Sequence, residues 1–202
     1  SYGGADINLF SPRQLARQRA VLPQNTTLAF PFTAFEIVRM GAVAYGGLDP
    51  DAQAQTALVN VGLRGFESRS YNYLSGGEQQ RVQFARALAQ VPHAVEDGEA
   101  RALFLDEPTA SLDIGHQISV LETARDFAEK GGLVLAILHD LNLAAEFADH
   151  LIVMHNGRIT AQGASFDTIS DETIARVYGI GGVAGRLPGA HIRLVFSVSR
   201  PR

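Results

Sequence analysis

The sequence predicts an α/β fold with a parallel sheet, and three features of one stretch of the chain support this prediction. Residues 102–105 and 133–138 are continuously apolar, which is typical of parallel strands covered on both faces. Residues 114–129 between them have the amphipathic pattern of a helix. Because parallel strands need a long crossover connection, we expect this helix to join the two strands.

Turn and capping residues delimit the other elements. Ser11 and Pro12 predict the start of a short helix, and Ser75 and Glu78 have the spacing of a capping box. Asn156-Gly157 predicts a two-residue hairpin. We therefore expect helices at 12–19, 33–40, 50–61 and 77–90, further strands at 20–22, 151–154 and 158–161, and an alternating segment at 192–198.

Composition excludes several classes of protein. The net charge of −4 gives no broad basic field, so nucleic acid is not an expected partner. The chain has no cysteine, which rules out a disulfide framework. No stretch approaches the roughly 20 apolar residues of a spanning helix. Lys130 is the only lysine and the chain opens with Ser1, and we take both as signs of a missing front end.

Residues 74–81, Leu-Ser-Gly-Gly-Glu-Gln-Gln-Arg, combine a hydroxyl group, two glycines and a predicted helix start. A helix N-terminus offers backbone N–H groups and the positive end of the helix dipole, which together bind anions. Gly76 and Gly77 let phosphate oxygens approach the main chain closely. For Ser75 and Glu78 alone, the alternative is an ordinary capping box on a surface helix.

Polar residues that follow the predicted strands predict chemistry at one edge of the sheet. Asp106 and Glu107 end the first apolar run, where open α/β sheets bind ligands. We expect Asp106 to bind Mg²⁺ and Glu107 to orient or deprotonate the attacking water of a phosphoryl transfer, the alternative being two solvated acids in a turn. His139 could contact a γ-phosphate at this edge or be structural, and Gln24 by itself is typical of a solvated loop.

Taken together, these motifs resemble those of the ATP-binding subunits of ABC transporters. The octet at 74–81 resembles the signature motif, Asp106-Glu107 the Walker B motif with its catalytic glutamate, 110–113 the D-loop, His139 the switch histidine and Gln24 the Q-loop. Glu78 stands where the family more often has glutamine. The motifs occur in the family's order, and the resemblance runs from near Asp6 to about Tyr178.

The resemblance implies a P-loop NTPase-like sheet core with a helical signature subdomain, acting on ATP with Mg²⁺. It implies catalytic roles for Glu107, His139 and Gln24, nucleotide contacts by Ser75, Gly76, Gly77, Gln79 and Asp113, and Mg²⁺ contacts by Asp106 and Gln24. Residues 1–202 would form one partial ABC ATPase domain, with the helical subdomain at about 25–90, the Walker B and switch-histidine part at about 101–178, and a tail at 179–202.

The chain departs from the family pattern in one respect. Nothing matches the phosphate-binding loop G-x-x-x-x-G-K-[ST], and Lys130 cannot replace its lysine because it lies after the Walker B-like strand. We therefore expect a chain truncated before the Q-loop, without the N-terminal Walker A portion. As written it should not hydrolyse ATP, and it should expose apolar sheet surface.

The partners and the cargo follow only from the resemblance. It implies a head-to-tail dimer of two copies, transmembrane permease subunits, a periplasmic haem-binding protein and a place on the cytoplasmic face of the bacterial inner membrane. The residues at 21–24, 30–33 and 37–41 resemble those of importers of iron chelates, haem and cobalamin. The long spacer at 91–101, together with 113–117 and 139–145, is most similar to haemin-import ATPases. Alternatives are import of ferric siderophores or cobalamin, a non-transport ABC protein, and an inactive ABC-type regulatory module.

Overall fold

The computed structural model describes residues 6–24, 26 and 30–179. The chain divides into two compact units, residues 1–139 and 140–202, and each is described by itself. The alternating segment expected at 192–198, like the tail after residue 179, lies outside the described residues. Among the described residues, no helix is long and apolar enough to cross a membrane.

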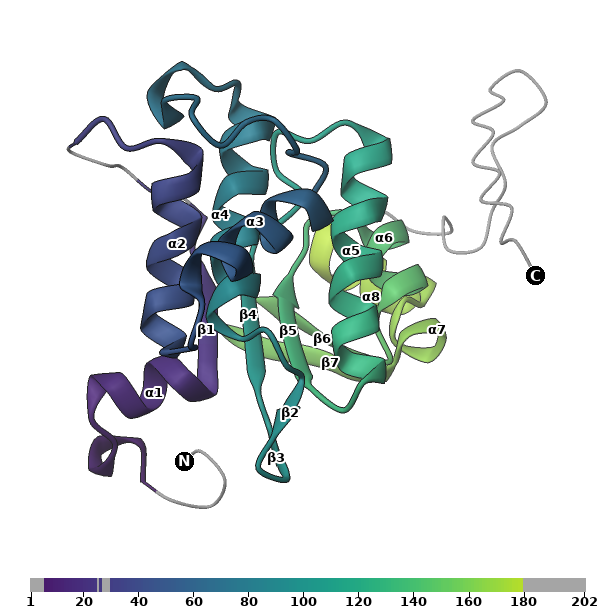
Figure 1. The fold of residues 1–202 in the computed structure, drawn as a ribbon. Coiled ribbons are helices and arrows are strands. Elements are labelled where there is room, and N and C mark those ends of the chain that lie inside the picture. Colours follow the sequence, from purple (N-terminus) through teal and green to yellow (C-terminus); the bar gives the residue numbers. More distant parts are fainter. Residues whose placement is uncertain (1–5, 25, 27–29, 180–202) are drawn as a thin grey trace, which may run out of the picture. The chain divides into compact units, whose positions relative to one another are not determined.

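A three-stranded parallel sheet forms the centre of the first unit (Figure 1). Its order is β1 (Arg19–Leu22), β4 (Ala102–Asp106), β5 (Leu133–Ile137), and α5 (Ile114–Glu129) connects the last two strands. The predicted parallel strands and their crossover helix are therefore confirmed. In register, Leu22 lies beside Leu105, and Asp106 lies beside Ile137, so all three strands end at one edge of the sheet.

Four helices of the first unit lie close to the predicted positions. They are α1 (Pro12–Gln18), α2 (Ala34–Tyr45), α3 (Pro50–Asn60) and α4 (Gly76–Gln90), with short 3₁₀ turns at Ile7–Leu9 and Tyr71–Tyr73. Thr33 caps α2 in a capping box, and Gly46 ends that helix in the left-handed conformation that suits glycine. Buried Ile37, Leu58 and Phe84 belong to the core that joins α2, α3 and α4 to the sheet.

Helices α2 and α4 approach each other unusually closely at Gly41. A Cβ atom placed on Gly41 would lie 2.1 Å from the carbonyl oxygen of Arg86 on α4. Only a residue without a side chain fits there, so Gly41 sets the distance between the two helices. The guanidinium group of Arg86 in turn donates to the backbone oxygen of Val21, which ties α4 to strand β1.

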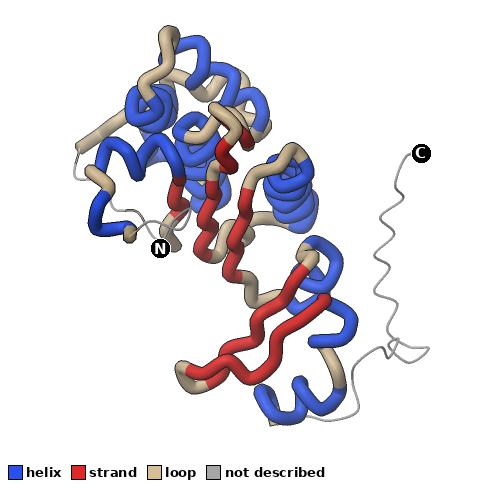
Figure 2. Tube along the Cα trace, turned by 90° about the horizontal axis from the view of Figure 1, so that it is seen from below, coloured by secondary structure: helices blue, strands red, loops and turns tan. Residues whose placement is uncertain are grey.

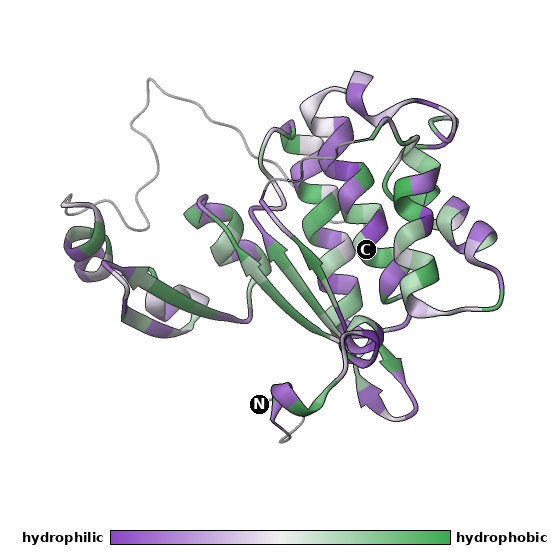
Figure 3. Cartoon of the chain, turned by 90° about the vertical axis from the view of Figure 1, so that its left-hand side faces the viewer, coloured by the Kyte–Doolittle hydropathy of each residue, from purple (hydrophilic) through white to green (hydrophobic). Residues whose placement is uncertain are grey.

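The two sides of the sheet differ in how they are covered. Leu22, Leu103 and Leu105 are buried in the same core as Phe84 of α4 and Phe127 of α5. Figures 2 and 3 show helices on one side of the three strands. On the other side, Val21, Phe104 and Leu135 are neighbours in register, and Val21 and Leu135 are exposed by 45% and 49%. The prediction that both apolar runs are covered on both faces is thus wrong for β5, whereas the expected exposure of apolar sheet surface is confirmed.

The segment between α4 and β4 contains a hairpin that the sequence analysis treated as a spacer. Strands β2 (Val95–Glu96) and β3 (Glu99–Ala100) pair in an antiparallel manner around Asp97 and Gly98, both of which have positive φ angles. The buried side chain of Arg101 donates to Glu96 at 2.8 Å. This ion pair anchors the hairpin to the start of β4.

The second unit is built on another antiparallel hairpin. Strands β6 (His150–His155) and β7 (Arg158–Ala164) are joined at Asn156-Gly157, as predicted, although β7 extends beyond the expected end at residue 161. Three helices that were not predicted surround the hairpin in sequence: α6 (Leu141–Phe147), α7 (Ser165–Thr168) and α8 (Asp171–Tyr178). They are short, so their periodicity is too brief to identify them from the sequence.

Candidate functional site

Gln24, Glu107 and His139 meet at the edge of the sheet where the three strands end. The Nε2 atom of His139 lies 2.6 Å from Oε1 of Glu107, and the side chain of Gln24 lies close enough to this carboxylate to lower its pKa. The side chain of His139 is 76% exposed and that of Glu107 is 20% exposed. The three residues predicted as catalytic are therefore neighbours, and His139 is open to a ligand.

The hydrogen bond from His139 holds the pKa of Glu107 below its ordinary value, and the Gln24 amide lowers it further. Both partners stabilise the ionised form of the carboxylate because they donate to it. Glu107 is therefore a carboxylate at neutral pH, which is the form that can accept a proton from water. Any stability gained from this ionisation is present above the ordinary glutamate pKa and is lost as the pH falls through the lowered value.

Replacement of His139 by alanine is expected to raise the pKa of Glu107 towards its ordinary value. The carboxylate loses its main donor and keeps only the Gln24 amide. The pH titration of the Glu107 carboxyl carbon by NMR measures this shift directly. His93→Ala, at an exposed histidine of the same unit that lines a separate pocket, is the control and should leave the titration unchanged. A titration curve that is the same in His139→Ala and in the unmodified protein would contradict the assigned hydrogen bond.

The backbone of Glu107 adopts the left-handed conformation, with φ at +50°. This conformation is uncommon for a residue with a side chain and has to be held by its surroundings. The amide of Glu107 donates to the carbonyl of Ile137 at 3.2 Å, and its own carbonyl accepts from the amide of Ala110 at 3.1 Å. The carbonyl also accepts from Nε2 of Gln80 on α4 at 3.2 Å.

Asp106 lies beside Glu107 and is the last residue of β4. Its half-buried carboxylate has no hydrogen-bonding or ion-pair partner within the part of the chain that the structure describes. Gln24 lowers the pKa of the neighbouring Glu107 carboxylate, which only its amide N–H groups can do, so its side-chain oxygen is the atom that would bind a metal ion. The Asp106 carboxylate and the Gln24 side-chain oxygen are oxygen donors, the type that Mg²⁺ prefers. This ion usually keeps several waters and binds through one or two carboxylates and the substrate phosphates.

The predicted anion site lies at the N-terminus of α4. Ser75 caps this helix, and both its amide and its hydroxyl group bond to the carboxylate of Glu78, at 2.7 and 2.8 Å. These bonds lower the pKa of Glu78, with the backbone bond first. Ser75 and Gly76 are exposed. Gln79 instead directs its amide at the carbonyls of Tyr71 and Leu74, both at 3.1 Å, where it holds the preceding loop.

The start of α4 packs against the turn that follows Glu107. A Cβ atom on Gly77 would lie 3.0 Å from the carbonyl oxygen of Ser111, so this glycine allows a close approach. Asp113 then caps α5 by accepting from the amide of His116 at 3.0 Å, and its other oxygen lies 2.7 Å from Nδ1 of His116. The backbone bond is the main reason why the pKa of Asp113 is lowered.

The predicted residues thus form two groups, and Gln80 connects them. Gln24, Asp106, Glu107 and His139 lie at the strand ends, whereas Ser75, Gly76, Gly77 and Asp113 lie around the start of α4. No separate role was expected for Gln80 from the sequence. Helical periodicity could have indicated that Gln80 belongs to the site, because a residue four positions after Gly76 lies on the same helix face.

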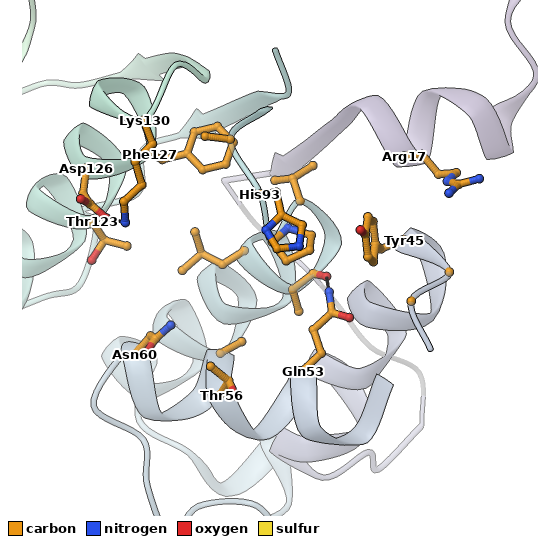
Figure 4. A pocket seen from close by; sticks show the side chains of 18 of the residues that line it. Arg17, Tyr45, Gln53, Thr56, Asn60, His93, Thr123, Asp126, Phe127 and Lys130 are labelled. Atoms are coloured by element: carbon orange, nitrogen blue, oxygen red, sulfur yellow. Dashed lines mark hydrogen bonds and ion pairs between the residues drawn. The ribbon is translucent and has the colours of Figure 1, made fainter. Parts of the chain in front are cut away.

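A pocket of about 680 Å³ lies elsewhere in the first unit (Figure 4). None of the predicted site residues lines it. Several of its polar groups are already occupied by the protein: Lys130 pairs with Asp126 at 2.6 Å, and the Gln53 amide donates to the Ala89 carbonyl. Since a ligand pocket needs convergent polar groups that remain available, we do not assign a ligand to it.

Comparison with known proteins places these features in a family. The family model described as ABC transporter matches residues 1–110. The hemin import ATP-binding protein HmuV of Agrobacterium fabrum is 77% identical over all of this chain, which covers 78% of that protein. The protein of the same name from a Jannaschia species is 53% identical over 87% of the chain and 65% of its own length.

A solved structure agrees with these matches. The ATP-binding subunit of an ABC transporter superposes with a TM-score of 0.63 at 27% identity. The match covers 82% of this chain and 64% of the solved one.

Proposed function

The chain belongs to the ABC transporter family, and on this premise we propose that it is the ATP-hydrolysing subunit of an importer of haem. The observation that carries the proposal is the contact of the Glu107 carboxylate with both His139 and Gln24 at the strand ends. A nucleotide-binding module without catalysis would need no ionised carboxylate held in this way. The exposed face of His139 leaves room for the terminal phosphate beside Glu107.

In the proposed reaction, Glu107 orients a water molecule towards the γ-phosphate and accepts its proton. Phosphoryl transfer depends mainly on positioning and on stabilisation of charge, so the role of Gln24 and His139 is to fix the carboxylate and keep it ionised. His139 can also donate to a phosphate oxygen. Mg²⁺, when bound, neutralises phosphate charge, and Asp106 and the side-chain oxygen of Gln24 are the residues that would hold it.

The proposed assembly contains two copies of the chain arranged head to tail. Ser75, Gly76 and Gly77 would contact the ATP held mainly by the other copy, because these residues cap an exposed helix N-terminus. Asp113 is exposed at the neighbouring helix start and would face the same interface. Membrane permease subunits are the partners that family membership implies, and we place the pair on the cytoplasmic face of the inner membrane.

The choice of haem rests on the relatives. The Agrobacterium protein that is 77% identical is named for hemin import, and the Jannaschia protein carries the same name. We therefore propose that a periplasmic haem-binding protein delivers the cargo to the permease. Ferric siderophores and cobalamin are the competing cargoes, and a transport assay separates them.

The test is reconstitution of the complete transporter in proteoliposomes, with its permease, its binding protein and an ATP-binding subunit in which this chain is preceded by a phosphate-binding loop G-x-x-x-x-G-K-[ST]. We expect ATP hydrolysis that increases when haem-loaded binding protein is added, together with haem uptake and no uptake of ferric siderophore or cobalamin. Uptake of either of these instead of haem would overturn the choice of cargo. If the transporter assembled but hydrolysed no ATP, the chain would be a regulatory module and the proposed function would be wrong.

A further inference from the structure

We propose that Gln80 is a positioning residue that connects the nucleotide-contacting start of α4 to the catalytic carboxylate of its own chain. The proposal rests on the proposed function, because it concerns how Glu107 is held during ATP hydrolysis. Its basis is one side-chain contact across 27 positions of the sequence, from Nε2 of Gln80 to the carbonyl oxygen of Glu107 at 3.2 Å. Gln80 is half-buried, so water competes only partly for this bond.

The Gln80 bond holds the backbone of the catalytic residue itself. Glu107 has a φ angle of +50°, and its peptide groups are held by the backbone of Ile137 and Ala110 and by the side chain of Gln80. If the Gln80 bond is lost, the Glu107 carbonyl keeps only the Ala110 amide as a donor, and a shift of this peptide group would turn the carboxylate of the same residue with it. The 2.6 Å contact with His139 then loosens.

The same face of α4 contacts the catalytic turn at a second place. Gly76 and Gly77, four and three residues before Gln80, lie against Ser111. A Cβ atom on Gly77 would lie 3.0 Å from the carbonyl oxygen of Ser111. Helix α4 therefore contacts the turn at Glu107 through a hydrogen bond and at Ser111 through close packing. Through these two contacts, a displacement of the start of α4 would be passed to the Glu107 backbone.

Gln90, another glutamine on α4, makes similar bonds to backbone carbonyls at a different place in the fold. The amide of Gln90 donates to the carbonyls of Ala16 and Arg19, both at 2.9 Å, near the start of β1. These bonds join α4 to α1 and β1 and do not contact the turn after β4. Gln90 is thus a matched control: the same residue type, on the same helix, with the same kind of backbone acceptor.

The experiment compares Gln80→Met with Gln90→Met in the reconstituted transporter. Methionine keeps the length of the side chain and removes the N–H donor. We expect Gln80→Met to lower kcat for ATP hydrolysis about tenfold with KM for ATP unchanged, since small displacements of a reacting group have effects of this size or larger. Gln90→Met should keep kcat. Equal kcat values in the two variants would overturn the proposal.

A double-mutant cycle with Glu107→Gln tests whether Gln80 acts through Glu107. Because the carboxylate is already absent in that background, we expect Gln80→Met to cause no further loss of the residual rate. An undiminished tenfold loss there would show that Gln80 acts elsewhere. If the unmodified transporter hydrolyses no ATP, it is the proposed function that fails, whereas an active transporter with an insensitive Gln80 contradicts only the present inference.

Two further variants keep the test decisive if Gln80→Met does not fold. Gln80→Lys retains an N–H donor at similar length, and Gln80→Glu retains the shape of the side chain without a donor. We expect the lysine variant to retain kcat within about threefold and the glutamate variant to lose about tenfold, on the same positional argument. Equal rates in these two variants would contradict a role for the donated hydrogen bond.

Discussion

Replacement of Glu107 by glutamine is expected to lower kcat for ATP hydrolysis by about 10² to 10⁴-fold, the usual contribution of a general base. The amide has nearly the same shape as the carboxylate but carries no charge and cannot accept a proton from water. Gln24 and His139 would remain in place, so ATP binding should persist and KM should change little. Steady-state hydrolysis by the reconstituted transporter, measured over a range of ATP concentrations, gives both constants.

The control for this prediction is Glu122→Gln, at an exposed glutamate on α5. It makes the same chemical change away from the strand ends and should leave kcat unaltered. A Glu107→Gln transporter that retains more than about a tenth of the original rate would be inconsistent with general-base catalysis by this residue. Asp106 would then be the remaining carboxylate at the strand ends to examine.

Replacement of Gly41 by alanine is expected to destabilise the first unit by about 1–3 kcal/mol, the usual cost of forcing extra atoms into a packed core. The new Cβ atom would lie 2.1 Å from the carbonyl oxygen of Arg86, a backbone atom that can move only with α4. Alanine is otherwise favoured over glycine in a helix by about 1 kcal/mol, so the steric effect must exceed that gain. The free energy of unfolding from urea titration measures the difference.

Gly115→Ala is the matched control for Gly41→Ala. Gly115 also lies in a helix, but a Cβ atom there would meet its nearest neighbour, an oxygen of Asp113, at an ordinary 3.5 Å. We expect this variant to be neutral or stabilised by up to about 1 kcal/mol. If Gly41→Ala were stabilised to the same extent as Gly115→Ala, α2 and α4 would have to lie further apart than the structure shows.

Local patterns in the sequence determined most of the elements of this protein. The apolar run at 102–105 became β4, the amphipathic pattern at 114–129 became α5, and Asn156-Gly157 formed the predicted turn. Such signals depend on residues that are close in the sequence, through side-chain periodicity and turn conformation. The residues at the ends of the strands could also be predicted as site residues, because a residue that follows a parallel strand lies at a known edge of the sheet.

Only the tertiary structure decided which side chains meet and which surfaces are covered. Gln24, Glu107 and His139 follow three different strands, and their contact requires the order β1-β4-β5. The bond from Gln80 to the Glu107 carbonyl depends on how α4 packs against the turn after β4. The apolar strand β5 is exposed although its composition is that of a buried strand, because burial depends on the elements packed over a strand and not on the strand itself.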